Sequence, residues 1–133
     1  MKNNVITWFD VPTADFNRAI KFYSAILGEE VKVMEHMGQK LGFFPMEGAG
    51  IGGDIVPPLD PASAITLNGI GHKVSDGGTR IYLNCEGHLQ EVLGRVEASG
   101  GKILAPRFAI GESGFIAIIK DSEGNTIGLH SLK

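Results

Sequence analysis

Few side chains in this chain have the chemistry for catalysis or metal binding. The 133 residues include one cysteine, Cys85, and four histidines. A single cysteine can form neither an internal disulfide nor a thiolate-cluster metal site, and we expect Cys85 to be a buried, small apolar side chain. His36 and His72 lie in turn-like stretches and His88 lies at the start of a helical pattern, which favours surface or capping roles. His130 differs, because it lies on a predicted strand.

Trp8 is the only tryptophan, and it lies in the apolar stretch VITWFDV. An indole that points into a pocket supplies a large, flat stacking surface with one N–H donor. Packing in the core is the alternative, and the sequence leaves both open. Phe43, Phe44 and Phe115 also lie on predicted strands, where they either line a pocket or pack under a helix.

Composition limits the classes of partner. The formal net charge is −3, and the charges are interspersed without a basic run, so we expect no nucleic-acid partner. Hydrophobic residues make up 43% of the chain, but no stretch approaches the roughly 18 apolar residues of a membrane span. The N-terminus enters a strand pattern without the features of a secretory signal, so we expect a cytoplasmic protein.

The elements that must position these residues occur twice along the chain. In the first half, the strand VITWFDV precedes a helix with apolar residues at helical spacing: Phe16, Ala19, Ile20, Tyr23, Ile26 and Leu27. In the second half, RIYLNC precedes a helix whose apolar face is formed by Leu89, Val92, Leu93 and Val96. Phe16 and Leu89 correspond at an offset of 73 residues, as do Gly28 and Gly101. Asp15 or Thr13 is expected to cap the first helix.

Three further strand candidates follow each helix, and by the last strand the offset has grown to 76. We therefore predict a single α+β domain, residues 1–133, made of two tandem βαβββ modules, about 4–56 and 79–131, joined by a linker at about 57–78. Each module covers one sheet face with its helix. Pairing of the two modules would close a curved, cup-shaped mixed sheet whose concave face is the pocket.

These residues resemble the vicinal oxygen chelate (VOC) superfamily, which groups glyoxalase I, extradiol dioxygenases, fosfomycin-resistance enzymes and bleomycin-resistance proteins. The resemblance rests on Asp15 with RAIKFYSAILG (18–28), EASGGKIL (97–104) and GFIAIIKDSEGNTIGL (114–129), and is closest to the glyoxalase-related group. It implies the glyoxalase/bleomycin resistance/dihydroxybiphenyl dioxygenase-like fold. It also implies a homodimer in which the groove is shared between subunits.

Catalytic members of this superfamily hold one divalent metal with side chains from the first and last strand of each module. The resemblance carries these positions to Trp8, Gly52, Ile81 and Gly128, none of which can ligate through its side chain. It therefore implies that the usual metal site is lost. The two glycines either let a ligand approach the backbone closely or form bulges and bends of a curved sheet.

Residues two apart on a strand share a face, so the neighbours of these four positions should also point into the cup. Asp10, Asp54 and His130 are among them, and they are either a displaced divalent-metal site, polar anchors for a ligand, or residues of the rim. We predict that the ligand-binding residues are Trp8, Asp10, Phe44, Asp54, Thr79, Ile81, Thr126 and His130.

The sequence thus favours a metal-independent protein that binds a small apolar or aromatic molecule. Two alternatives stay open. One is an enzyme, such as a lyase, isomerase or dioxygenase, with a non-standard metal or acid–base site. The other is a structural or interaction protein. No catalytic residue is identified, because a general base must reach the proton that it removes and the sequence does not show that geometry.

Overall fold

A computed structural model of the chain describes residues 6, 8–36, 38–48, 50–58 and 78–133, so the predicted linker lies almost entirely outside the described residues. Two βαβββ modules follow one another, as predicted, and the α+β fold class is confirmed. The first contains β1 (Trp8–Pro12), α1 (Phe16–Leu27), β2 (Lys32–His36), β3 (Gln39–Phe43) and β4 (Gly52–Val56). The second contains β5 (Tyr82–Asn84), α2 (Leu89–Val96), β6 (Lys102–Ala109), β7 (Phe115–Lys120) and β8 (Thr126–Ser131), with short 3₁₀ turns at Glu97–Ser99 and Gly111–Ser113.

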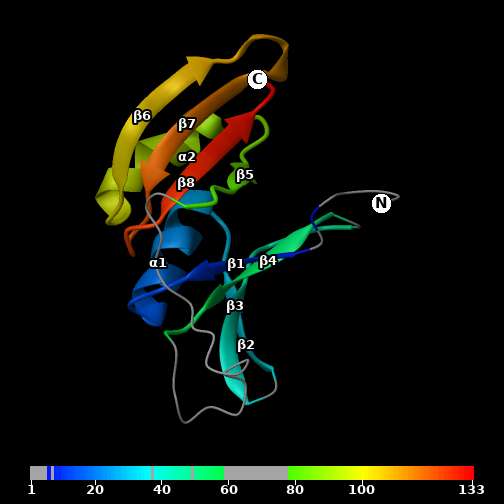
Figure 1. Ribbon diagram of the computed structural model, residues 1–133, viewed down its shortest axis with the longest axis vertical. Helices are drawn as coiled ribbons and strands as arrows, with labels where there is room; N and C mark the ends of the chain where they lie inside the picture. Colours follow the sequence, from blue (N-terminus) through cyan, green and yellow to red (C-terminus); the bar gives the residue numbers. More distant parts are fainter. Residues whose placement is uncertain (1–5, 7, 37, 49, 59–77) are drawn as a thin grey trace.

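Each module forms its own four-stranded mixed sheet. The strand orders are β1-β4-β3-β2 and β5-β8-β7-β6, and we call the two sheets A and B. In both, the first strand is parallel to the last and the other neighbours are antiparallel. In Figure 1, sheet B lies above and sheet A lies below the junction between the two modules. Helices α1 and α2 contact each other near this junction. Each sheet therefore keeps one face towards the helices and one open face.

Helix α1 has the predicted ends. The Asp15 carboxylate accepts a hydrogen bond from the backbone N–H of Arg18 at 3.1 Å, and Gly28 ends the helix in the left-handed conformation at φ 69°. Thr13, the other candidate cap, instead donates its hydroxyl hydrogen bond to the carbonyl of Val56 at 2.7 Å. Asp15 is therefore the N-cap, and Thr13 ties the start of the helix to sheet A.

The hydrophobic core is shared by the two modules. The largest side chains in it are Tyr23, Phe22 and Ile26 of α1, which are 0–1% exposed. They belong to one cluster with Leu89, Val92, Leu93 and Val96 of α2 and with strand residues of both sheets. Cys85 also belongs to this cluster, and burial raises the pKa of its thiol to about 11. The prediction of a buried cysteine is confirmed, and the thiol stays protonated at neutral pH.

The turn between β7 and β8, residues 121–125, connects the second module to the first. The Tyr23 hydroxyl donates to the Asp121 carboxylate at 2.6 Å. Glu123 accepts hydrogen bonds from the backbone N–H groups of Ala14 and Asp15 and from the Arg18 guanidinium at 2.7 Å. The turn thus holds the N-terminal end of α1.

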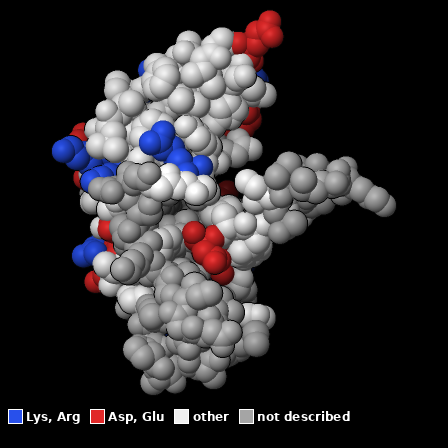
Figure 2. Space-filling view, viewed as in Figure 1, with Lys and Arg blue, Asp and Glu red and all other residues white. Residues whose placement is uncertain are grey.

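On the face shown in Figure 2, acidic and basic side chains are interspersed, as they are along the sequence. Among the described residues, no helix is both long enough and apolar enough to cross a membrane.

Candidate functional site

The strand register identifies the positions where relatives would place metal ligands. Trp8 pairs with Gly52 between β1 and β4, and Tyr82 pairs with Gly128 between β5 and β8. Tyr82, rather than Ile81, is therefore the second-module equivalent of Trp8. The position predicted from the offset of 73 is therefore off by one residue in this register, because Trp8 precedes the helix start Phe16 by eight positions, whereas Tyr82 precedes the helix start Leu89 by seven.

Aromatic rings cover both glycines at these positions. A Cβ atom at Gly52 would lie 2.7 Å from Cζ3 of Trp8, and one at Gly128 would overlap the ring of Tyr82. The register is even on both sides of Gly128, so that position is not a bulge, and Gly52 is the first residue of β4. The space left by the missing side chains is occupied by rings of the same chain.

The residues present do not fit the divalent-metal site of catalytic relatives. Such a site needs imidazole or carboxylate donors, whereas these positions hold an indole, a phenol and two glycines. Nor does the fold bring together Asp10, Asp54 and His130. His130 lies on sheet B, where its Nε2 is 2.7 Å from the carbonyl oxygen of Ser113. Within the described part of the chain, no group of three or more His, Cys, Asp or Glu residues could hold a metal ion.

Asp10 and Asp54 are direct register partners on the open face of sheet A, next to Trp8. Asp54 is 4% exposed, and its Oδ1 atom has no hydrogen-bond partner among the described residues. Burial raises the pKa of Asp54 to about 7, and the Asp10 carboxylate adds to the shift through a hydrogen bond and its charge. A hydrogen bond with Trp8 acts in the opposite direction. Asp54 therefore exchanges a proton close to neutral pH.

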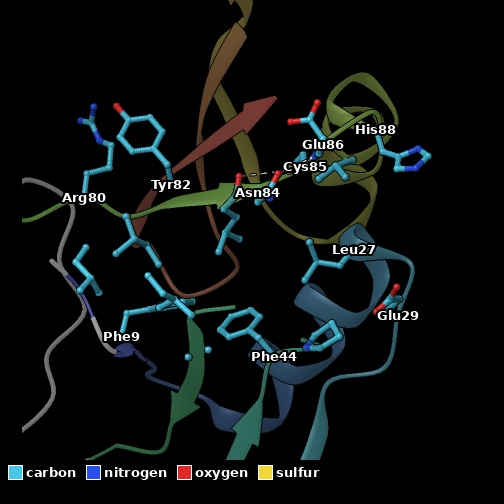
Figure 3. Close-up of a pocket in the computed structure, with 18 of the residues that line it drawn as sticks. Phe9, Leu27, Glu29, Phe44, Arg80, Tyr82, Asn84, Cys85, Glu86 and His88 are labelled. Carbon is cyan, nitrogen blue, oxygen red and sulfur yellow. Dashed lines mark hydrogen bonds between the residues drawn. The ribbon is translucent and has the colours of Figure 1, made fainter. Parts of the chain in front are cut away.

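A cleft of about 890 Å³ lies between the two modules (Figure 3), and neither Asp10 nor Asp54 is among its lining residues. Its lining includes β1 and the segment around β4 on one side, and residues 79–86 with the start of α2 on the other. The volume falls within the range of small-molecule pockets. The cleft exists only because both modules are present.

The inner wall of the cleft is apolar and aromatic. The rings of Phe9 and Phe44 have centroids 5.5 Å apart, and Leu27, Leu83 and Val92 add aliphatic surface. Glycine is required at Gly53, because a Cβ atom there would overlap the Phe9 ring. The charged residues Glu29, Arg80 and Glu86 and the imidazole of His88 also line the cleft. The His88 side chain pairs with Glu91 at 2.8 Å rather than capping α2.

The predicted ligand-binding residues lie in three places. Phe44, Thr79 and Ile81 line the cleft. The other five are on the open faces of the sheets, three on sheet A (Trp8, Asp10 and Asp54) and two on sheet B (Thr126 and His130). Sequence reasoning missed Phe9, Leu27 and Leu83, which also line the cleft. Phe9 and Leu83 lie on strands β1 and β5, and Leu27 is the last residue of helix α1. Successive side chains of β1 point to opposite faces of the sheet, so Phe9 and Trp8 lie on different faces. The prediction selected residues on the face of Trp8 and therefore left Phe9 out.

Comparisons with known proteins agree with this architecture. Residues 5–129 match the model of the Glyoxalase/Bleomycin resistance protein/Dioxygenase superfamily. A glyoxalase-related enzyme from Fulvimarina pelagi is similar in structure, with a TM-score of 0.68, 15% identity and coverage of 98% of this chain and 88% of that chain. No curated protein matches the sequence.

Two structures with more specific descriptions are also similar. A lactoylglutathione lyase from Agrobacterium tumefaciens has a TM-score of 0.62 at 20% identity, over 98% of this chain and 96% of that chain. A fosfomycin resistance protein from Listeria monocytogenes has a TM-score of 0.63 at 16% identity, over 97% and 93%. At these identities the likeness shows a shared fold.

Proposed function

The chain belongs to the Glyoxalase/Bleomycin resistance protein/Dioxygenase superfamily, and from this premise we propose that it is a cytoplasmic, metal-independent protein that binds a small apolar or aromatic molecule. The observation that carries the proposal is that ring-covered glycines, Gly52 and Gly128, occupy two of the positions that the resemblance assigns to metal ligands. Elemental analysis after incubation with nickel, zinc, manganese or iron(II) tests the first half of the proposal. One tightly bound metal per chain would contradict it.

The cleft between the modules is the proposed binding site, because its aromatic inner wall and charged lining suit a mostly apolar ligand. The dye 1-anilinonaphthalene-8-sulfonate is a suitable probe, since its fluorescence rises in apolar sites. We expect Ile81→Trp, which enlarges a side chain in the cleft, to weaken binding at least about tenfold. Ile116→Trp, on the open face of sheet B, is the matched control and should leave binding unchanged. Equal effects of the two variants would remove the cleft from the proposal.

One observation favours an enzyme as the second candidate. Asp54 has a pKa of about 7 beside Asp10, and a carboxyl group with this pKa can act as a general acid or base at neutral pH. Isomerisation by proton transfer is a reaction class that an acid–base carboxyl group can catalyse without a metal. A superfamily substrate that is turned over by the natural protein but not by Asp54→Asn would establish this function.

We further propose that the protein forms a homodimer. Large apolar side chains are exposed on both sheets, including Trp8 (45%), Met34 (52%), Tyr82 (48%) and Phe108 (44%). Contiguous exposed apolar surface commonly marks an interface. Size-exclusion chromatography with light scattering should give twice the chain mass of 14.2 kDa. A clean monomer at all concentrations would contradict the dimer.

A further inference from the structure

The charged side chains that line the cleft between the modules are separated by sign. Arg80 is the only lysine or arginine among the described lining residues, and it lies towards the same end of the cleft as Phe9 (Figure 3). Glu29 and Glu86 lie nearer to the other end, which Leu27 marks. The two ends of the cleft therefore favour groups of opposite charge.

At the basic end, Arg80 and Tyr82 form a pair of donors, the Arg80–Tyr82 pair. The two residues are two apart in the extended segment that leads into β5, so their side chains project from the same face. Figure 3 shows both side chains directed the same way. The backbone N–H of Gly128 donates to the carbonyl of Ile81 at 2.9 Å, which fixes the segment between them on sheet B. The pair thus presents a guanidinium and a phenol hydroxyl together.

Both groups of the pair are accessible to a ligand. Within the described part of the chain, neither the Arg80 guanidinium nor the Tyr82 hydroxyl has a hydrogen bond or an ion pair. Arg80 is exposed, and Tyr82 is 48% exposed. β5 is an edge strand of sheet B, so side chains from both of its faces border the cleft. A ligand beside Ile81 can therefore reach the Arg80–Tyr82 pair without displacing the core.

A carboxylate has the chemistry that matches this pair. A guanidinium donates two parallel N–H bonds to a carboxylate, and a phenol hydroxyl supplies a further donor. A phosphate monoester carries close to two negative charges at neutral pH, more than this single cation compensates. We infer that the cleft selects a small aromatic carboxylic acid whose carboxylate binds the Arg80–Tyr82 pair. The inference rests on the proposed function of the cleft and specifies its ligand.

The aromatic part of such a ligand has a fixed wall to pack against. The half-buried rings of Phe9 and Phe44 have centroids 5.5 Å apart. Phe44 in turn meets the ring of Tyr23 edge to face, at 5.2 Å and 80°, and the Tyr23 hydroxyl is bonded to Asp121. The wall is therefore held in place by the buried core. A planar ring gains more from such a wall than a flexible aliphatic chain, which loses more conformational freedom on binding.

The acidic end sets the orientation of the ligand. Glu29 forms no ion pair or hydrogen bond among the described residues, and Glu86 accepts one hydrogen bond, from the backbone N–H of Leu132 at 3.2 Å. Arg95 lies next to the start of this end, but its Nε donates to the carbonyl of Ile26 at 3.0 Å and it forms no ion pair with Glu29. Two carboxylates repel a third. The ligand carboxylate therefore points to the basic end.

Calorimetric titration of the full chain with 1-naphthylacetate and its neutral analogue 1-naphthylacetamide tests the inference, because the two compounds share a ring and nearly the same shape. We expect the acid to bind at least about tenfold more tightly than the amide. Arg80→Gln should weaken binding of the acid at least about tenfold and leave the amide unchanged. Arg80→Lys, which keeps the charge but loses the two-point geometry, should retain part of the preference.

Two further variants separate the pair from charge and from packing. Tyr82→Phe keeps the ring over Gly128 but removes the hydroxyl, and should reduce the preference for the acid about threefold. Arg107→Gln is the matched control, because it makes the same charge change on sheet B at a guanidinium that lies over the Phe115 ring, 3.7 Å from its centroid. This variant should keep the full preference.

Equal binding of the acid and the amide would overturn the inference, as would a preference that survives in Arg80→Gln. Binding of the acid that is unaffected by Ile81→Trp would also overturn it, because the acid would then lie outside the cleft. If the amide and the dye bind and Ile81→Trp weakens both, but the acid has no advantage, the inference fails and the proposed function stands. If neither compound nor the dye binds, both fail.

Discussion

Gly52 and Gly128 each pack against the aromatic ring of a register partner, Trp8 and Tyr82 respectively. Each glycine leaves room above the sheet, and the ring of its register partner lies over that room. A ring over a strand glycine restores the packing that the missing side chain would have provided. The pairs therefore stabilise the strands while removing donor atoms from both positions.

This arrangement predicts opposite effects for the same substitution at two glycines. Gly128→Ala should destabilise the protein by about 1–3 kcal/mol, because the new methyl group overlaps the Tyr82 ring. Gly94→Ala should stabilise it by about 1 kcal/mol, because that position lies within α2 and an added Cβ would meet nothing within 4 Å. Urea unfolding measures both effects. In a Tyr82→Ala background the cost of Gly128→Ala should shrink, and an undiminished cost would contradict the ring-over-glycine account.

Asp54 predicts an unusual dependence of stability on pH. Its pKa is about 7 in the folded protein against an ordinary value of 3.8, so the folded state holds a proton that the unfolded state releases between these values. Its stabilising contribution is fully present below pH 3.8 and is lost as the pH rises through 7. Allowing for solvent at the open face, the loss should be about 1–3 kcal/mol. Asp54→Asn should flatten this part of the profile, and an unchanged profile would contradict the assignment.

At the scale of elements, the 121–125 turn decides how the second module meets α1. Glu123 is buried at its carboxylate and receives hydrogen bonds from Arg18 and from the backbone at the start of the helix. Burial acts to raise the pKa of Glu123, but the Arg18 hydrogen bond and the other donors outweigh it, so the pKa is lowered. The ionised carboxylate of Glu123 thus stabilises the junction between the modules.

Glu123→Gln should therefore destabilise the protein by about 1–3 kcal/mol at neutral pH. The contribution of Glu123 is present above its unfolded pKa and is lost as the pH falls through the lowered folded value, opposite in direction to that of Asp54. Thermal unfolding at pH 7 and below pH 4 should show the difference between natural protein and variant shrinking in acid. Glu112→Gln, at an exposed position, is the control. A constant difference would mean that the effect is not ionic.

The elements themselves were predictable because their signals are local. The apolar spacing of α1, its Asp15 cap and its Gly28 end are all encoded within fourteen residues, and the repeat reproduces the pattern in the second half. The cleft was not predictable in the same way. Phe9 comes from β1 and Leu27 from the end of α1, whereas Leu83 comes from the other module. Their proximity depends on how the modules dock, which no spacing along the chain reports.

At the scale of the whole molecule, the two sheets are separate but the core is not. The buried cluster runs from Tyr23 and Phe22 of α1 to Val92 and Val96 of α2, and the 121–125 turn adds polar bonds across the same junction. Each helix therefore covers its own sheet and packs against the other module. The modules resemble two domains in topology, yet neither keeps a complete core alone.

This shared core predicts a single cooperative unfolding transition. Trp8 reports on the first module in the natural protein. A Trp8→Phe variant that also carries Phe108→Trp moves the probe to β6, at an exposed position of the second module. In the natural protein, the Trp8 fluorescence and the far-ultraviolet circular dichroism should give the same urea midpoint. In the double variant, the tryptophan at position 108 should likewise give the same midpoint as circular dichroism, and Trp8→Phe alone shows how much the loss of Trp8 changes stability. A midpoint at β6 that differs from the circular dichroism midpoint would mean that the modules unfold independently.

Tyr23→Phe removes the hydroxyl that donates to the Asp121 carboxylate, so it weakens the junction between the modules. This variant should lower the urea midpoints of both modules together.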